Sequence, residues 1–318
     1  MGCLSRDSSS SGLRCTIHVG DQLILSKTPK VELDSQHSVS LPIAGRHLGA
    51  ISMARPKPKH HHRAVFLPDK PGFSGPNAEG RGLGYVQAWH RRSWEASPFC
   101  VPNEYICGEI GRFLRLPIPP FSITYGVDGQ YFFTSLNFNF NREEQLPPIE
   151  PEVTWDRLQS LCTGVLLFDI LIANSDRHDA NLAADSVGSP NAISVFDHDQ
   201  ALFGGGFPLK GIDRLGALTG RLGISNGEVT QGNRHCLLDV ANSSESFGKW
   251  FKRIESIPDW FIDEVCSEAS QYGLSAREVE VVQIFLKHRR NGIEQIVKDS
   301  ANQFTLITSW PWDGGLFK

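Results

Sequence analysis

An apolar run of thirteen residues, followed at once by a polar loop, constrains this chain more than any other feature. Leu161 to Ala173 spells LCTGVLLFDILIA and carries a single charge, Asp169. A run of this length and composition predicts a buried helix. Asn174 and Ser175 break the apolar pattern and open a polar loop that continues to Asn181. Side chains on this loop are therefore attached to a rigid core element, where binding and catalytic groups are commonly placed.

A short β-hairpin is predicted directly after the loop. Leu182 to Ala184 and Ala192 to Phe196 have the composition of strands, and the turn-rich residues 185–191 (DSVGSPN) connect them. Asp197 follows the second strand. The loop before the hairpin and the residue after it are thus expected to lie close together.

Three polar residues on this framework have a spacing that is typical of phosphoryl transfer. Asp176 is followed five positions later by Asn181, and sixteen positions after that by Asp197. In kinase-like enzymes the first Asp orients or deprotonates the attacking hydroxyl, and the Asn and the second Asp hold Mg²⁺ against the ATP phosphates. We therefore expect Asp176 to be catalytic and Asn181 and Asp197 to bind the metal, with Asp199 as the fallback ligand.

His178 and Asp179 admit a different interpretation, the metal-binding pair of an HD-type phosphohydrolase. Such a site needs further His and Asp ligands on other helices. The upstream histidines, at 60–62, lie in a Pro/Lys-rich segment that is not predicted to be helical. The phosphohydrolase is therefore the less favoured alternative.

The segment before the apolar helix predicts a smaller unit of mixed structure. Residues 102–114 carry apolar side chains at helical spacing, and Phe121 to Tyr125 and Gln130 to Thr134 predict a hairpin around an Asp-Gly turn. A glycine-rich turn at 80–84 leads into an earlier strand. Glu104, near the helix start, is expected either to hold a phosphate-binding lysine or to be a solvated carboxylate favoured by the helix N-terminus.

Three stretches together resemble the HipA-like kinases, relatives of the protein kinases and phosphoinositide kinases. They are PNEYICGEIGRFLRLPIPP at 102–120, NSDRHDANL at 174–182 and VFDHDQALF at 195–203, and the resemblance covers roughly residues 60 to 300. It implies an α+β, two-lobed, protein-kinase-like fold with a small mixed N-lobe and a mainly helical C-lobe. It also implies Ser/Thr protein phosphorylation, and some members of the family are toxins restrained by a DNA-binding antitoxin.

The resemblance assigns roles to individual residues as well. Asp176 would be the catalytic aspartate, and Asn181 and Asp197 the magnesium ligands. Further residues are expected at the nucleotide, namely Gly82, Gly84, Gln87, Glu104 and Leu136, the last in a segment that resembles the connection between the lobes. We divide the chain into an N-terminal extension (1–55), an N-lobe (56–140), a C-lobe (141–300) and a tail (301–318).

Gln87 departs from the family pattern, in which a strand usually ends in Val-Lys and the lysine contacts the nucleotide phosphates. The neutral amide of Gln87 cannot supply that point charge. Either Lys70, Arg91 or Arg92 substitutes from a neighbouring position, or the chain is a nucleotide-binding pseudokinase. A small-molecule kinase also stays open, because aminoglycoside phosphotransferases use a comparable order of Asp, Asn and Asp.

Composition excludes several other classes of protein. The 318 residues are 40% hydrophobic and 21% charged, which is typical of a globular protein, and the net charge of −4 gives no basic footprint for nucleic acid. No apolar run reaches the roughly 18 residues of a membrane span. The seven cysteines contain no CxxC pair, which favours free thiols in a reducing compartment. We therefore expect a cytoplasmic protein without direct contact with nucleic acid or membrane. The resemblance to the HipA-like kinases implies that its substrate is a protein.

The C-terminal part is expected to be helical. Helices are predicted at 239–254, 260–272 and 276–299, whereas the glycine-rich residues 209–231 have no clear assignment. On the last of these helices, Arg289 and Arg290 are expected on a solvated face.

Overall fold

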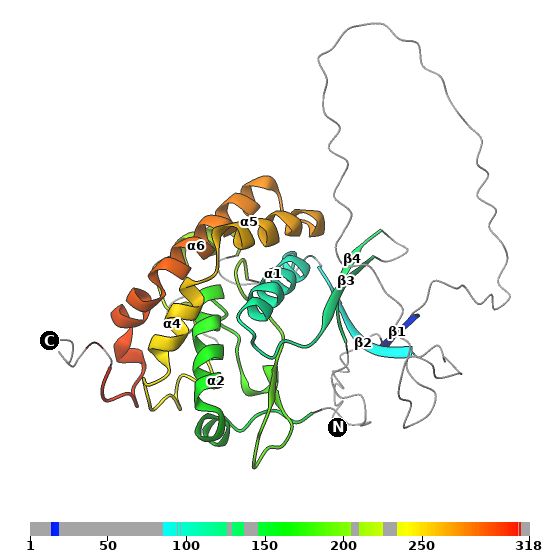
Figure 1. The fold of residues 1–318 in the computed structure, drawn as a ribbon. Coiled ribbons are helices and arrows are strands. Elements are labelled where there is room, and N and C mark those ends of the chain that lie inside the picture. Colours follow the sequence, from blue (N-terminus) through cyan, green and yellow to red (C-terminus); the bar gives the residue numbers. More distant parts are fainter. Residues whose placement is uncertain are drawn as a thin grey trace, which may run out of the picture. The chain divides into compact units, whose positions relative to one another are not determined.

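The structure is a computed structural model that describes residues 14–18, 85–93, 95, 97–125, 129–136, 146–204, 210–224, 234–310 and 312. Of residues 14–18, 85–90 and 136 it describes the backbone alone. The chain divides into two units, one formed by residues 1–16 and 86–318 and the other by residues 17–85. Nearly all described residues belong to the first unit, and Figure 1 draws the described helices and strands as coloured ribbons.

A four-stranded sheet lies at one end of this unit, with the strand order β1-β2-β4-β3. Its members are β1 (Arg14–His18), β2 (Tyr85–Arg92), β3 (Phe121–Tyr125) and β4 (Tyr131–Leu136). The pairs β2–β4 and β3–β4 are antiparallel, and Phe133 of β4 has Arg91 and Ile123 as its two neighbours across the strands. Strands β3 and β4 are the hairpin that the alternating pattern predicts.

Helix α1 (Cys100–Phe113) packs against β4 and against α5 (Asp259–Glu268). Its residues are almost all buried up to Gly111. A Cβ atom at Gly108 would lie 2.6 Å from Cε1 of Phe121, so the close approach of α1 to the sheet requires glycine at this position. The predicted helix at 102–114 is therefore confirmed, and it carries Glu104 into the interior.

Helix α2 (Pro151–Ile172) is the central element of the helical part and contains the apolar run. Its buried residues extend without a break from Cys162 to Ile172. It packs against α4 (Phe247–Glu255) and α6 (Ala276–Asp299). The small hairpin of β5 (Leu182–Ala184) and β6 (Ile193–Val195) follows, with Leu182 opposite Val195. The remaining elements are η1 (Asp179–Asn181), α3 (Gly211–Leu218), α4 (Phe247–Glu255), α5 (Asp259–Glu268), η3 (Ala269–Tyr272), α6 (Ala276–Asp299) and η4 (Ala301–Gln303).

One helix prediction needs correction, and the segment without an assignment contains a helix. Helix α4 begins at Phe247, not at residue 239, because the intervening polar residues make other bonds: the Asn242 side chain accepts a hydrogen bond from Nε1 of Trp155 at 3.0 Å. Within the unassigned segment 209–231, α3 is a helix. Helix α6 has the predicted bounds, and a capping box of Ser275 and Glu278 defines its start.

The prediction that Arg289 and Arg290 are solvated is wrong, since both side chains are buried. Arg289 donates to the carbonyl of Ile170 (Nε–O 3.1 Å) and to that of Leu222 (Nη2–O 3.0 Å). The last carbonyls of a helix have no partner within the helix, and Arg289 supplies donors to the end of α2. Arg290 forms an ion pair with Asp259 at the start of α5 (Nη2–Oδ1 2.6 Å).

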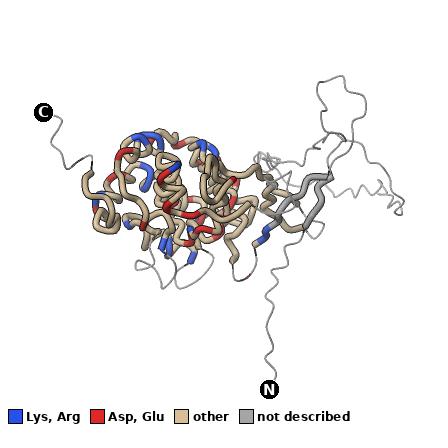
Figure 2. Tube along the Cα trace, turned by 90° about the horizontal axis from the view of Figure 1, so that it is seen from below, with Lys and Arg blue, Asp and Glu red and all other residues tan. Residues whose placement is uncertain are grey.

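The described part of the chain is mixed α+β, as the sequence predicts. Among its helices, none has the length and hydropathy needed to cross a bilayer. Figure 2 shows acidic and basic positions interspersed along the helical part of the trace. The cysteines at 100, 107, 162, 236 and 266 are free thiols, four of them buried.

Candidate functional site

The polar loop begins where α2 ends in a left-handed residue, Ala173 (φ 51°). Asn174 then folds back onto the helix: its N–H donates to the carbonyl of Asp169 at 2.9 Å and its Nδ2 to Oδ1 of Asp169 at 3.1 Å. The Oδ1 atom of Asn174 accepts the N–H of Asp176 at 3.2 Å. The backbone of the proposed catalytic residue is therefore tied to the buried end of α2.

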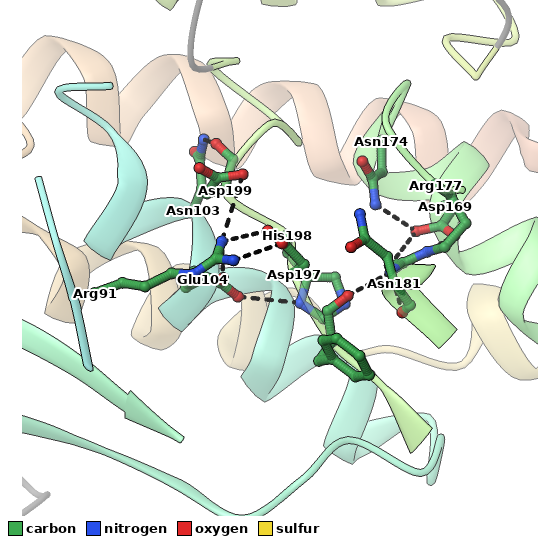
Figure 3. A network of polar contacts seen from close by, with 11 residues as sticks. Arg91, Asn103, Glu104, Asp169, Asn174, Arg177, Asn181, Asp197, His198 and Asp199 are labelled. Atoms are coloured by element: carbon green, nitrogen blue, oxygen red, sulfur yellow. Dashed lines mark hydrogen bonds and ion pairs between the residues drawn. The ribbon is translucent and has the colours of Figure 1, made fainter. Parts of the chain in front are cut away.

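Arg177 is completely buried and connects α2 to the residues that flank the hairpin, Asn181 directly before β5 and Phe196 directly after β6 (Figure 3). Its Nε and Nη2 donate to the two carboxylate oxygens of Asp169 at 2.8 and 3.1 Å. Its Nη1 donates to the carbonyl of Asn181 at 3.0 Å and also to that of Phe196. Because Phe196 precedes Asp197, one guanidinium holds the backbone beside both proposed magnesium ligands.

His235 completes the buried cluster around Asp169. Its Nε2 lies 3.0 Å from Oδ2 of Asp169, and its Nδ1 accepts the N–H of Leu237 at 3.1 Å. Since Nδ1 is an acceptor, the ring proton is on Nε2 and is donated to the carboxylate. Burial lowers the pKa of His235. Burial also opposes ionisation of Asp169, but the charge and hydrogen bonds of Arg177 hold the pKa of Asp169 well below its usual range.

Asp176 and Asn181 face each other across the loop. The Nδ2 of Asn181 donates to the carbonyl of Asp176 at 3.0 Å, and the carbonyl of Asn181 accepts the N–H of Phe196 at 3.4 Å. Burial raises the pKa of Asp176, partly offset by the neighbouring His178, and the charge of Asp197 acts in the same direction as burial. Asp176, Asn181 and Asp197 are thus brought to one place, as their spacing predicts.

Asp197 follows β6 in a left-handed conformation (φ 65°), which is unfavourable for a residue other than glycine and recurs at functional sites. Both of its carboxylate oxygens accept hydrogen bonds from the guanidinium of Arg91, with Nη2–Oδ2 at 2.5 Å. The Nη1 atom of Arg91 also lies 3.5 Å from Oε1 of Glu104 and 3.8 Å from Oδ1 of Asp199. One cation therefore faces three carboxylates (Figure 3).

The pKa values of this group follow from its crowding. Burial disfavours the charged form of Arg91, but hydrogen bonding to Asp197 raises the pKa of the guanidinium above its usual value. Burial likewise works against the charge of Asp197, and the bonds from Arg91 lower the pKa of Asp197. Burial and the negative charge of Asp197 raise the pKa of Asp199 to about 7. Asp197 therefore keeps its charge to a lower pH than Asp199 does.

Of the two described cations that could compensate for Gln87, Arg91 contacts Glu104 (Nη1–Oε1 3.5 Å). Arg92 points elsewhere and donates to Oε1 of Gln130 at 3.3 Å. Lys70 lies outside the described residues, and for Gln87 only the backbone in β2 is described. The alternative that Glu104 is a solvated carboxylate is wrong, because only 2% of the residue is exposed.

Of the other residues expected to bind the nucleotide, the structure describes only the backbone of Leu136. Leu136 ends β4 opposite Ala88 of β2, and its side chain is not described. Gly82 and Gly84 lie outside the described residues. Sequence reasoning missed the contributions of Asp169 and His235. The lone charge in the apolar run was a signal for Asp169, whereas His235 had none.

The donor set suits magnesium better than the metal of a phosphohydrolase. A carboxylate on Asp197 and an amide on Asn181 are hard oxygen donors, and Mg²⁺ is usually held by one or two such groups together with phosphate oxygens and water. The His178–Asp179 pair is loose (Nδ1–Oδ1 3.9 Å) and both side chains are more than one-third exposed. Within the described ranges, no three His, Cys, Asp or Glu residues form a group that could hold a metal.

Comparisons with known proteins give structural similarities alone. No family model matches the sequence, and no curated protein matches it. The fold is similar to that of the proinflammatory kinase CtkA of Helicobacter pylori, with 14% identity, a TM-score of 0.45, and coverage of 77% of this chain and 98% of that chain. It is also similar to Shewanella oneidensis HipA in a complex with HipB and operator DNA, with 12% identity and a TM-score of 0.27, covering 69% of this chain and 55% of that one. Because both identities and both TM-scores are low, the site residues rest on the contacts within this chain alone.

Proposed function

We propose that the chain is an ATP-dependent phosphotransferase that acts on a hydroxyl group. The observation that carries the proposal is the meeting of Asp176, Asn181 and Asp197 with the Arg91–Glu104 pair. Two acidic groups, an amide and an oriented cation are the polar components that phosphoryl transfer requires, because its catalysis is mostly positioning and charge stabilisation.

Each side chain has a distinct role in this proposal. Asn181 and Asp197 would hold Mg²⁺, which when bound neutralises charge on the nucleotide phosphates. Asp176 accepts the proton of the attacking hydroxyl, and the raised pKa produced by its burial makes it a better base. Arg91 leaves Asp197 and turns its guanidinium fork to the phosphates, for which it is geometrically suited. Glu104 keeps Arg91 in place during this exchange.

The nature of the acceptor rests on the resemblance to HipA-like kinases. We favour Ser or Thr of a protein, with a small molecule as the alternative acceptor. The two-lobed arrangement, the cytoplasmic location and an antitoxin partner likewise stay predictions.

A second candidate, the nucleotide-binding pseudokinase, is favoured by one observation. Both carboxylate oxygens of Asp197 accept hydrogen bonds from Arg91, so a metal ion must compete with a bidentate ion pair. If Arg91 does not release Asp197, nucleotide would bind without productive magnesium. The two functions therefore differ in whether Mg²⁺ strengthens the binding of ATP.

Titration of ATP with and without Mg²⁺ tests the proposal through Asp197. Asp197→Ala should weaken the binding of Mg·ATP by about tenfold or more, the effect of losing one charge-assisted contact, and should affect metal-free ATP much less. Asp156→Ala is a matched control, because Asp156 is exposed near the far end of α2. Equal losses with and without metal, or no loss, would contradict the magnesium role.

A further inference from the structure

Two buried hydrogen bonds connect α1 to the residues that follow β6. The Nδ2 of Asn103 donates to the carbonyl of Asp199 at 2.7 Å, and Nδ1 of His198 lies 3.2 Å from Oε2 of Glu104. Asn103, Glu104 and His198 are 0%, 2% and 1% exposed. The segment that carries Asp197 is therefore attached to α1 through its next two residues (Figure 3).

His198 is oriented by the core as well as by Glu104. Its ring meets the ring of Phe168 on α2 edge to face, with centroids 5.6 Å apart and an interplanar angle of 75°. Since the partner of Nδ1 is a carboxylate, the proton on Nδ1 is donated to Glu104. The position of the imidazole is thus set from two sides.

The other polar atom of His198 shows that stability alone does not account for this residue. In the described part of the chain, Nε2 of His198 is buried without a hydrogen-bond partner, as is Oδ1 of Asn103. An unpaired buried polar atom lowers stability, so an apolar side chain against Phe168 would avoid this penalty. A buried group of this kind calls for another explanation, and the bond to Glu104 provides one.

Glu104 uses its two oxygens for two different partners. Oε2 accepts from His198, while Oε1 faces Nη1 of Arg91 at 3.5 Å. The contacts therefore run from His198 through Glu104 to Arg91, and from Arg91 back to Asp197. A glutamate side chain has considerable rotamer freedom, and the bond to His198 removes it.

We propose that His198 is a positioning residue that orients Glu104. With Glu104 held in place, Arg91 still faces a carboxylate when the Asp197 side chain turns from Arg91 to the metal. The inference rests on the proposed function and adds to it the reason why a histidine lies between the two aspartates. Helix α1 and the segment that carries Asp197 are then held together by two hydrogen bonds, of which the second is that of Asn103 to the carbonyl of Asp199.

Two substitutions of His198 separate positioning from packing. His198→Leu keeps an apolar side chain against Phe168 and removes the donor, whereas His198→Asn places an amide nitrogen near the position of Nδ1. We expect His198→Leu to raise the Kd of Mg·ATP by about tenfold or more, the effect of one hydrogen bond to a charged group, at unchanged binding stoichiometry. His198→Asn should recover most of the affinity. His288→Leu on α6 is the control, because that histidine is exposed.

A merely structural role would give a different result, namely a lower binding stoichiometry at unchanged Kd, with no recovery by His198→Asn. Either that outcome or an unchanged Kd in His198→Leu overturns the inference while leaving the proposed function intact. Failure of the parent protein to bind Mg·ATP would overturn the proposed function and the inference with it.

The coupling is also measurable without nucleotide. Denaturant unfolding of His198→Leu, Glu104→Gln and the double variant forms a double-mutant cycle, which reports whether the two residues interact. We expect the double variant to lose less stability than the sum of the two single variants. Additive losses would contradict the link between His198 and Glu104. Should His198→Leu fail to fold, His198→Asn and Glu104→Gln provide the same cycle with a smaller expected coupling.

Discussion

Removal of the Arg177 guanidinium should destabilise the fold and the site together. Arg177→Met keeps much of the apolar side-chain volume and eliminates the two hydrogen bonds to Asp169 and the two to the carbonyls of Asn181 and Phe196. Asp169 is left completely buried, with Asn174 and His235 as neutral donors. Breaking a buried ion pair by removing one partner costs about 3–5 kcal/mol.

That magnitude is large compared with the total stability of a typical domain, about 5–15 kcal/mol. Urea unfolding at neutral pH, followed by circular dichroism, should therefore show a clear fall in the midpoint. Arg157→Met is the matched control, since Arg157 is exposed on α2. A loss of less than about 1 kcal/mol in Arg177→Met, the range of an exposed ion pair, would refute the account of the cluster.

A second substitution, at Asp169, identifies the cause of the stability loss in Arg177→Met. If the loss arises from an uncompensated buried charge, Asp169→Asn in the Arg177→Met background should restore part of the stability, because the neutral amide is far less costly to bury. A double variant that is less stable than Arg177→Met would show that lost packing, and not the stranded carboxylate, dominates.

Three further outcomes follow from the same contacts. Burial lowers the pKa of His235, so the unfolded chain binds a proton near pH 6.5 that the folded chain does not, and stability falls as the pH drops below about 6.5. The free energy of unfolding, measured with denaturant at pH 7 and at pH 5, should therefore differ less in His235→Gln than in the parent. Arg91→Ala should reduce phosphoryl transfer by about 10²-fold or more, the scale of losing one transition-state donor, in an assay where Arg92→Ala has little effect; equal effects would remove the special role of Arg91. Gln87→Lys should leave the turnover and the affinity for ATP nearly unchanged, because Arg91 already supplies the cation for the phosphates. A clear gain in turnover would instead show that the phosphate-binding cation belongs at position 87.

Local patterns predicted the elements that carry the site. The apolar run from Leu161 identified the buried end of α2, and the turn-rich residues 185–191 identified the hairpin that separates Asn181 from Asp197. Both signals depend on neighbouring residues in the chain. The spacing of the three polar residues could be interpreted because these elements restrict where their backbone can lie.

Long-range contacts could not be predicted in the same way. His235 reaches Asp169 across 66 positions, and Arg289 reaches Ile170 across 119, so no local pattern marks either contact. Charged residues on α6 were expected at the surface because hydrophobic periodicity does not show which carbonyls need a donor. Arg91 was one of several candidate cations, since no motif determines the register of β2; the pairing of Arg91 with Phe133 and its contact with Glu104 distinguish it.

In the proposed function, the polar residues around the end of α2 transfer phosphate, with Asp176 as the base. The most direct measurement is the transfer of label from γ-labelled ATP to the chain itself and to Ser/Thr-containing model proteins, with mass-spectrometric detection of the phosphorylated residue. Asp176→Asn should bind Mg·ATP like the parent and transfer phosphate at least about 10²-fold more slowly, the scale of general acid–base catalysis. An Asp176→Asn variant that transfers phosphate as fast as the parent would contradict the claim.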